Sequence, residues 1–356
     1  MKTLLSLFCL VTYLTCALSA NGWPISLDMA CGKALSAVAC SFEFTNNANE
    51  DLYLLKRNTP LEGLNSEFVS VSLDGRPLEY EGIIMRCAPP AKDEFVLLKG
   101  GESISASVQI TDIFSIDTDG LYTVQYSRPL QYLSVNEMSA MSIHQLRGSF
   151  VRESVQLYLE DTSVLSKPKI EEVKIDYTVH IEACGSASFS NGNVNNSKTL
   201  DAHKKLCAGT DRAKNKVGNI TVSITWFGRY DAGRTATAKK TYTDVKSGIT
   251  NNVVTYYNNG PRCGAKTYAY VLSNVKNTVY LCNLYYKSQT YCSTSAESKE
   301  GTLLHEWSHS YAGRIDYKSG GTDYYGRSKC KELAKNDPAN AVKNADNYCY
   351  HYCDAQ

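Results

Sequence analysis

The pentapeptide His305-Glu306-Trp307-Ser308-His309 constrains the fold of this chain most, because its chemistry requires an α-helix. Side chains at positions i and i+4 lie above one another on one helical face, so both imidazoles can converge on a single metal ion. Zinc held by three protein ligands retains a position for water and lowers the pKa of that water to about 7. The carboxylate of Glu306 can then accept a proton as the water attacks a peptide carbonyl. The motif therefore predicts a zinc site with its own general base.

The residues around the motif indicate a buried helix. Apolar side chains recur there at helical spacing, namely Leu303, Leu304, Trp307 and Tyr311. Gly313 suits the position that follows the last helical residue. The same pattern would also surround two ordinary polar histidines, because HExxH arises by chance in unrelated helices. A third ligand is therefore needed to support the metal site.

Three positions compete for the third ligand. In the metzincin pattern HExxHxxGxxH, Gly313 and Asp316 each fall one residue late, and Asp316 is not a histidine. A thermolysin-like site takes a glutamate from a second helix further downstream, and Glu332 is the nearest candidate. The last candidate is Asp323, within the segment Gly-Gly-Thr-Asp-Tyr-Tyr-Gly at 320–326.

The segment 320–326 resembles the GTxxDxxYG signature of the aspzincins, the family of deuterolysin and peptidyl-Lys metalloendopeptidase. In that family the aspartate is the third zinc ligand, and the tyrosine donates to the developing oxyanion. The resemblance implies one zinc ion per chain, held by His305, His309 and Asp323, with Glu306 as general base on a zinc-bound water. It also implies that Tyr325 is the oxyanion donor.

The segment departs from the family signature in length, because it is two residues shorter. The shortening leaves the choice of Tyr325 over Tyr324 open. It also keeps Asp316 as an alternative zinc ligand in place of Asp323.

The resemblance to the aspzincins extends over most of residues 180–352. The similar segments occur in the order found in the family, at 225–228, 268–271, 278–282, 301–304 and 337–347. The resemblance implies a zincin-like metalloprotease domain that hydrolyses peptide bonds in proteins or peptides. It further implies a disulfide between Cys263 and Cys282, which flank an apolar segment as a family disulfide does.

Asp346 lies in the segment that resembles the NADN stretch of the family. In its peptidyl-Lys members this aspartate lies at the S1′ pocket and pairs with the lysine that follows the scissile bond. A lysine that enters a partly dry pocket loses hydration, and a facing carboxylate offsets that loss. The resemblance therefore implies that Asp346 binds substrate and favours lysine at P1′. Residues 348–353 differ from the family, so wider activity on basic proteins stays open, as does a helix-capping role for Asp346.

The first half of the chain has a different pattern. Residues 21–135 contain short runs of alternating apolar and polar residues between turn residues, which predict an all-β, immunoglobulin-like sandwich. We expect 136–178 to be a connecting segment, with an exposed processing site at Lys167-Pro168-Lys169, and 179–356 to be an α+β catalytic domain. The first half carries no catalytic constellation, so a prosegment, a folding aid and a substrate-binding module are all open.

Within the catalytic domain, the helical pattern around the pentapeptide is flanked by other predicted elements. We predict helices over 199–217, 232–257, 328–335 and from residue 338, and strands over 220–226, 268–272 and 278–281.

The start of the chain and its cysteines indicate export. Residues 1–20 have the charge, apolar run and small residues of a secretory signal peptide. No later segment is long and apolar enough to span a bilayer. The cysteines outside this signal are numerous and read mostly as disulfides in an exported protein. The 37 basic and 36 acidic residues give a net charge of +1, which does not indicate a nucleic-acid partner.

Two other functions are compatible with these patterns. One is a secreted binding or toxin-like module in which the zinc site is structural or inactive. The other is a peptidase of another zincin clan, with a different third ligand. Both alternatives depend on which carboxylate completes the metal site.

Overall fold

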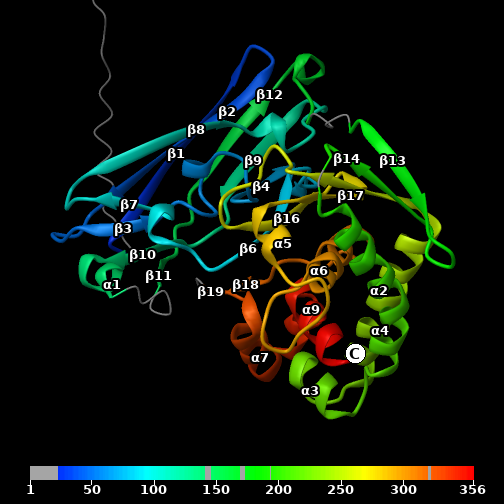
Figure 1. Ribbon diagram of the computed structural model, residues 1–356. Helices are drawn as coiled ribbons and strands as arrows, with labels where there is room; N and C mark the ends of the chain where they lie inside the picture. The colour runs from blue at the N-terminus through cyan, green and yellow to red at the C-terminus, as the bar shows by residue number, and fades with distance from the viewer. Residues whose placement is uncertain (1–22, 141–145, 169–172, 193, 320–321) are drawn as a thin grey trace, which may run out of the picture.

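The structure is a computed structural model that describes residues 23–140, 146–168, 173–192, 194–319 and 322–356 (Figure 1). The strands of the N-terminal half, coloured blue to green, lie on one side of the molecule, and most helices of the second half lie on the other. The signal peptide expected at 1–20 lies outside the described residues. Within these ranges, none of the helices has the length and apolar character needed to cross a membrane.

Antiparallel sheets make up the N-terminal half. One contains β1 (Ile25–Ala34), β2 (Ala37–Asn46) and β8 (Ser103–Gln109), in the order β1-β2-β8. Another contains β11 (Arg147–Ser149), β10 (Leu130–Ser134), β3 (Leu52–Leu55) and β7 (Phe95–Leu98), in that order. A further sheet contains β12 (Ser154–Leu159), β9 (Gly120–Tyr126), β4 (Val69–Leu73) and β5 (Arg76–Pro77), in that order. Short elements between them are η1 (Pro60–Glu62), η2 (Lys92–Glu94), η3 (Ile110–Asp112), α1 (Val135–Ser139) and η5 (Thr162–Val164).

Buried and exposed side chains alternate along the strands, and the buried ones form the core of the N-terminal half. In β2, Phe42 and Phe44 are buried while Ser41 and Glu43 are exposed, because successive side chains point to opposite faces of a sheet. The sheets extend beyond the expected limit at residue 135, since β11 and β12 lie within the segment that we expected to be a connection.

The second half contains a mixed sheet with helices packed on it. Its strands are β13 (Ile175–His180), β14 (Ser186–Ser190), β15 (Val253–Asn258), β17 (Val275–Leu281) and β16 (Thr267–Leu272), in that order across the sheet. β14, β15 and β17 run parallel, whereas β16 runs antiparallel to β17. The strand at the far end of this order, next to β16, is β6 (Ile83–Cys87) from the N-terminal half.

The helices of the second half surround the predicted metal motif. They are α2 (Asn196–Asn215), α3 (Thr221–Phe227), α4 (Ala232–Asn251), α5 (Asn283–Lys287), α6 (Lys299–Ala312), α7 (Gly326–Asn336), α8 (Pro338–Ala341) and α9 (Ala345–Asp354). The short strands β18 (Lys318–Ser319) and β19 (Thr322–Asp323) form a hairpin between α6 and α7. α6 packs against α2, α4, α9, β16 and β17, so it lies at the centre of this domain.

The strand predicted over 220–226 is wrong, because these residues form α3. Its β-branched residues favour a strand locally. In the fold, however, Ser223, Trp226 and Phe227 share one buried helical face, and burial of that face outweighs local propensity.

The cysteines of the described residues are partly paired. The disulfide predicted between Cys263 and Cys282 is confirmed. Three more disulfides join described cysteines, at Cys31–Cys40, Cys184–Cys207 and Cys292–Cys353. The free thiols in the described ranges belong to Cys87, Cys330 and Cys349.

Candidate active site

Helix α6 carries the pentapeptide, and its ends are set by local interactions. At the N-terminus the Ser298 hydroxyl accepts a hydrogen bond from the Gly301 amide at 3.0 Å, which satisfies one free helical donor. At the C-terminus Gly313 has φ of 61°, in the left-handed region that glycine adopts without strain. The helix predicted from the sequence is therefore confirmed, and it places both histidines of the motif on one buried face.

The two histidines face each other through their Nε2 atoms, which lie 3.0 Å apart. The Nδ1 atom of His305 donates to a carboxylate oxygen of Asp346 at 2.8 Å. The Nδ1 atom of His309 donates to the Arg314 carbonyl at 2.6 Å. Because both partners can only accept, each Nδ1 carries a proton, which leaves Nε2 of each ring as the nitrogen that can bind a metal ion.

Asp316 completes a cluster with these two rings. Its Oδ1 atom lies 3.2 Å from Nε2 of His305 and 3.5 Å from Nε2 of His309. After Gly313, the Ile315 amide donates to the Lys343 carbonyl and the Ile315 carbonyl accepts from the Ala345 amide, each at 2.9 Å. These hydrogen bonds hold Ile315 against the start of α9, so the next residue, Asp316, lies beside the two histidines.

This donor set fits a divalent cation. The cluster of His305, His309 and Asp316 is the one group of this kind found in the described parts of the chain. Burial lowers the pKa of His305, but Asp316 and Asp346 outweigh burial and raise it to about 9, so the cluster favours positive charge. Two imidazoles and a carboxylate, with the outer imidazole nitrogens bonded to protein acceptors, are a typical zinc ligand set.

Asp323, the expected third ligand, lies elsewhere. The β18–β19 hairpin places it opposite Lys318, whose Nζ atom is 3.4 Å from its Oδ1 atom. Its other oxygen is 3.5 Å from the Asn58 side-chain amide. The structure therefore brings Asp316, and not the expected Asp323, beside the two histidines, because the backbone hydrogen bonds of Ile315 hold the chain there before the hairpin begins. Glu332, the thermolysin-like candidate, forms an ion pair with Lys329 on α7.

Glu306 is buried beside the cluster. Neither of its carboxylate oxygens has a hydrogen-bond partner among the described residues. Burial raises its pKa to about 7, and the neighbouring histidines oppose that rise. A carboxylate with free oxygens and a pKa near neutrality suits a residue that accepts and returns a proton.

Tyr325 faces the cluster from the start of α7. Its ring centroid lies 6.4 Å from that of His305, and its hydroxyl donates to the Met85 carbonyl at 3.2 Å. Tyr324 instead packs its ring on Tyr317, with centroids 5.6 Å apart. Of the two tyrosines, the structure thus brings Tyr325 to the site.

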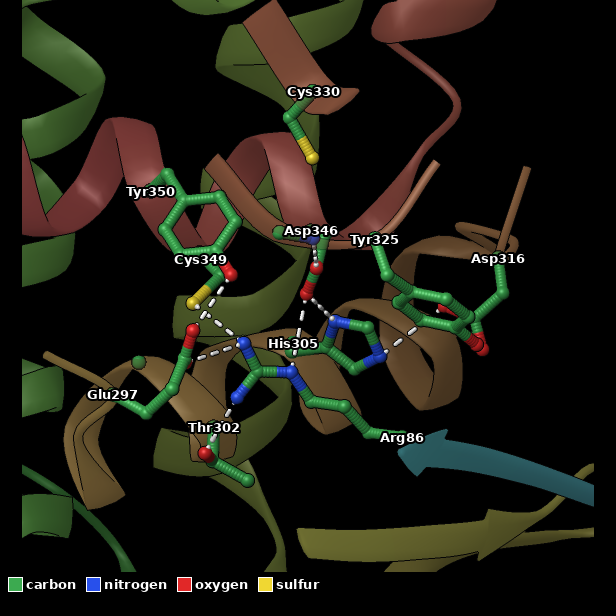
Figure 2. A network of polar contacts seen from close by, with 12 residues as sticks. Arg86, Glu297, Thr302, His305, Asp316, Tyr325, Cys330, Asp346, Cys349 and Tyr350 are labelled. Atoms are coloured by element: carbon green, nitrogen blue, oxygen red, sulfur yellow. Dashed lines mark hydrogen bonds and ion pairs between the residues drawn. The ribbon is translucent and has the colours of Figure 1, made fainter. Parts of the chain in front are cut away.

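Asp346 connects the cluster of His305, His309 and Asp316 to the side chain of Arg86 (Figure 2). The oxygen that accepts from His305 also accepts from Nε of Arg86 at 3.1 Å, and the other oxygen accepts from the Gly326 amide at 2.9 Å. Burial raises the pKa of Asp346, but Arg86 and His305 outweigh burial and lower it to about 2. The carboxylate of Asp346 therefore orients the His305 ring and also neutralises the charge of Arg86.

The sequence did not predict Arg86 or the other residues that contact its guanidinium. Arg86 donates from Nη1 to the Thr302 hydroxyl at 2.6 Å and from Nη2 to Glu297 at 2.9 Å. Its guanidinium also lies 5.3 Å from the centre of the Tyr268 ring. These residues come from separate elements, so the one local signal was a charged residue within the apolar run 83–87.

Several known proteins resemble this chain. Residues 212–353 match the aspzincin family, which is described as lysine-specific metallo-endopeptidase. An extracellular protease of Aeromonas hydrophila is 28% identical over 326 residues, covering 88% of this chain and 87% of that protein. A peptidyl-Lys metalloendopeptidase of Pleurotus ostreatus is 32% identical over 135 residues, covering 37% of this chain and 73% of that protein. A solved zinc peptidase from Grifola frondosa has 31% identity, covers 44% of this chain and 91% of its own, and gives a TM-score of 0.37.

The family match spans residues 212–353, which include the clustered residues His305, His309 and Asp316. The chain belongs to the aspzincin family and is a metalloendopeptidase, a hydrolase that acts on peptide bonds.

Proposed function

We propose that this chain is a secreted zinc endopeptidase that cleaves before basic residues, with one zinc ion held by His305, His309 and Asp316. The observation that carries the proposal is the convergence of two Nε2 atoms and one carboxylate oxygen at 3.0–3.5 Å in a buried site. A bound zinc ion supplies positive charge that polarises the scissile carbonyl and acidifies water.

Glu306 is the proton carrier in this proposal. It accepts a proton from the water that attacks the scissile carbonyl carbon, and it passes that proton to the amide nitrogen as the C–N bond breaks. Its burial and its free oxygens support this role. Tyr325 donates to the carbonyl oxygen as negative charge develops there, a type of contact that contributes about 2.7–4 kcal/mol to transition-state stabilisation.

Asp346 and Glu297 form the specificity pocket in this proposal. Both carboxylates contact the same guanidinium in the structure, which supports a site for a basic P1′ side chain. An ammonium group of lysine would meet the same two charges. The name of the Pleurotus ostreatus relative and the description of the family agree with lysine at this position.

Export and architecture complete the proposal. The signal-like residues 1–20, the disulfides and the similarity to an extracellular protease support a secreted protein. The antiparallel sheets of the first half support an immunoglobulin-like sandwich ahead of a zincin-like catalytic domain.

The test uses the full chain and casein. Mass spectrometry of new amino termini is expected to find mostly lysine with the wild-type chain and no cleavage with Glu306→Gln, although both chains bind zinc. A matched control is Glu300→Gln, which changes another buried glutamate of α6 and is expected to retain cleavage. Equal digestion by Glu306→Gln and the wild-type chain would contradict the proposal.

A further inference from the structure

Strand β6 from the N-terminal half forms the edge of the sheet in the second half of the chain. Among the described strands, β6 is the last in the sheet order and pairs antiparallel with β16, with Met85 opposite Tyr270 and Arg86 opposite Ala269. Without β6, strand β16 would end the sheet with unpaired backbone groups beside α6. Extended peptides bind such edges by strand addition, and pockets for their side chains give specificity.

The peptide bond between Met85 and Arg86 lies where a scissile bond is expected. Tyr325, the proposed oxyanion donor, already donates to the Met85 carbonyl at 3.2 Å. The next side chain, that of Arg86, enters the pocket of Asp346 and Glu297. The carbonyl before the bond thus meets the oxyanion donor, and the side chain after it fills the proposed S1′ pocket.

Arg86 fills that pocket with complementary charge (Figure 2). Its side chain is 3% exposed, and it forms ion pairs with Asp346 at 3.1 Å and Glu297 at 2.9 Å. A basic side chain of another protein cannot reach these carboxylates while the guanidinium is present. Arg86 and a basic substrate side chain therefore compete for the pocket formed by Asp346 and Glu297.

The N-terminal half holds β6 at both ends. Before the strand, the Glu81 amide donates to the Ile113 carbonyl at 2.8 Å. After it, the Ala88 carbonyl accepts from Nη1 of Arg57 at 2.7 Å. Because Ile113 and Arg57 belong to the N-terminal half, displacement of β6 requires this half to move or to be removed.

We propose that residues 83–87 are a built-in, substrate-like inhibitor in which Arg86 anchors the Met85–Arg86 bond across the active site. The N-terminal half thereby slows the hydrolysis of other proteins by this chain until β6 leaves the cleft. This proposal rests on the proposed function, and it assigns to that site both its blocking segment and its acceptance of arginine.

The first test compares casein hydrolysis by full-length chains. Loss of one partner from a buried charge pair commonly weakens binding by a factor of about 30 or more. We therefore expect Arg86→Ala and Arg86→Gln to hydrolyse casein at least about 30-fold faster than the wild-type chain. Arg86→Lys is expected to stay inhibited, because lysine suits the same pocket. The control Arg76→Ala removes an exposed arginine of β5 and is expected to behave as wild type.

Thermal unfolding identifies the folded variants. Arg86→Gln serves if Arg86→Ala does not fold, because the glutamine amide lies near the position of Nε of Arg86, where it can still donate to Asp346. Folded Arg86→Gln with the same measurable rate as the wild-type chain overturns the inhibitory role. Absence of hydrolysis by every chain instead overturns the proposed function.

The second test reads out binding without catalysis. A fluorescein-labelled peptide that reproduces residues 81–89, with serine at position 87, is titrated by fluorescence anisotropy. We expect it to bind the Glu306→Gln/Arg86→Gln chain at least about 30-fold more tightly than the Glu306→Gln chain. Equal affinities overturn the proposal that β6 occupies the substrate site, whatever the outcome of the casein assay.

Discussion

Replacement of Asp346 by asparagine tests whether one buried carboxylate supports the metal site. Three N–H groups point at its two oxygens, from His305 at 2.8 Å, Arg86 at 3.1 Å and Gly326 at 2.9 Å. An asparagine offers one acceptor oxygen, and its NH₂ group cannot accept. Whichever way the amide is turned, at least one of these hydrogen bonds is lost, together with the charge that faces Arg86.

The expected magnitude follows from those losses. Removal of an outer partner of a metal-binding histidine commonly weakens metal affinity by about 10–100-fold, or about 1.4–2.8 kcal/mol. Removal of one member of a buried ion pair costs about 3–5 kcal/mol of folding free energy. We expect Asp346→Asn to show both effects, because the same carboxylate contacts His305 and Arg86.

The assay is competition for zinc with a fluorescent chelator, alongside denaturant unfolding of the zinc-loaded chain. The control Asp244→Asn breaks an ion pair of α4, in which the Lys240 side chain is 74% exposed, and is expected to leave zinc affinity unchanged. If Asp346→Asn binds zinc within a factor of about two of the wild-type chain, the histidine-orienting role inferred for this carboxylate is refuted.

Three further predictions concern the oxyanion donor, acid stability and packing around α6. Tyr325→Phe, made in the Arg86→Gln chain, is expected to lower kcat about 100–1000-fold with little change in KM, and an unchanged kcat in steady-state kinetics would refute the donor role. Burial lowers the pKa of His203 and of His351 from 6.5 to about 4, so the unfolded chain binds protons more readily below pH 6.5. Each histidine is then expected to cost about 3 kcal/mol of stability as the pH falls from 6.5 to 4, and denaturant unfolding that is equally stable at both pH values would contradict this. Gly301→Ala would place a methyl group 2.9 Å from the Cys349 sulfur, so we expect a lower melting temperature, measured by calorimetry.

The sequence predicts the features of this site that depend on local periodicity. The spacing of His305 and His309, the apolar residues around them and Gly313 all lie within one helix, so a single stretch of sequence places both imidazoles on one face. The disulfide between Cys263 and Cys282 was predicted from the family resemblance, and the structure contains it.

The features that depend on contacts between distant segments were not predictable in this way. Asp316 rather than Asp323 reaches the histidines because Ile315 bonds to residues 343 and 345. Arg86 reaches Asp346 because β6 crosses from one half of the chain to the sheet of the other. Neither pairing can be predicted from periodicity in the sequence. The one local indication of a different third ligand was that the segment 320–326 is two residues shorter than the family signature.

Zinc content of two single variants tests the central claim most directly. Full-length Asp316→Ala and Asp323→Ala are purified in parallel, dialysed against a weak chelator and analysed for bound zinc by atomic emission. We predict that Asp323→Ala retains one zinc ion per chain, as the wild-type protein does, and that Asp316→Ala loses it. Zinc retained by Asp316→Ala and lost by Asp323→Ala would contradict the ligand set of His305, His309 and Asp316.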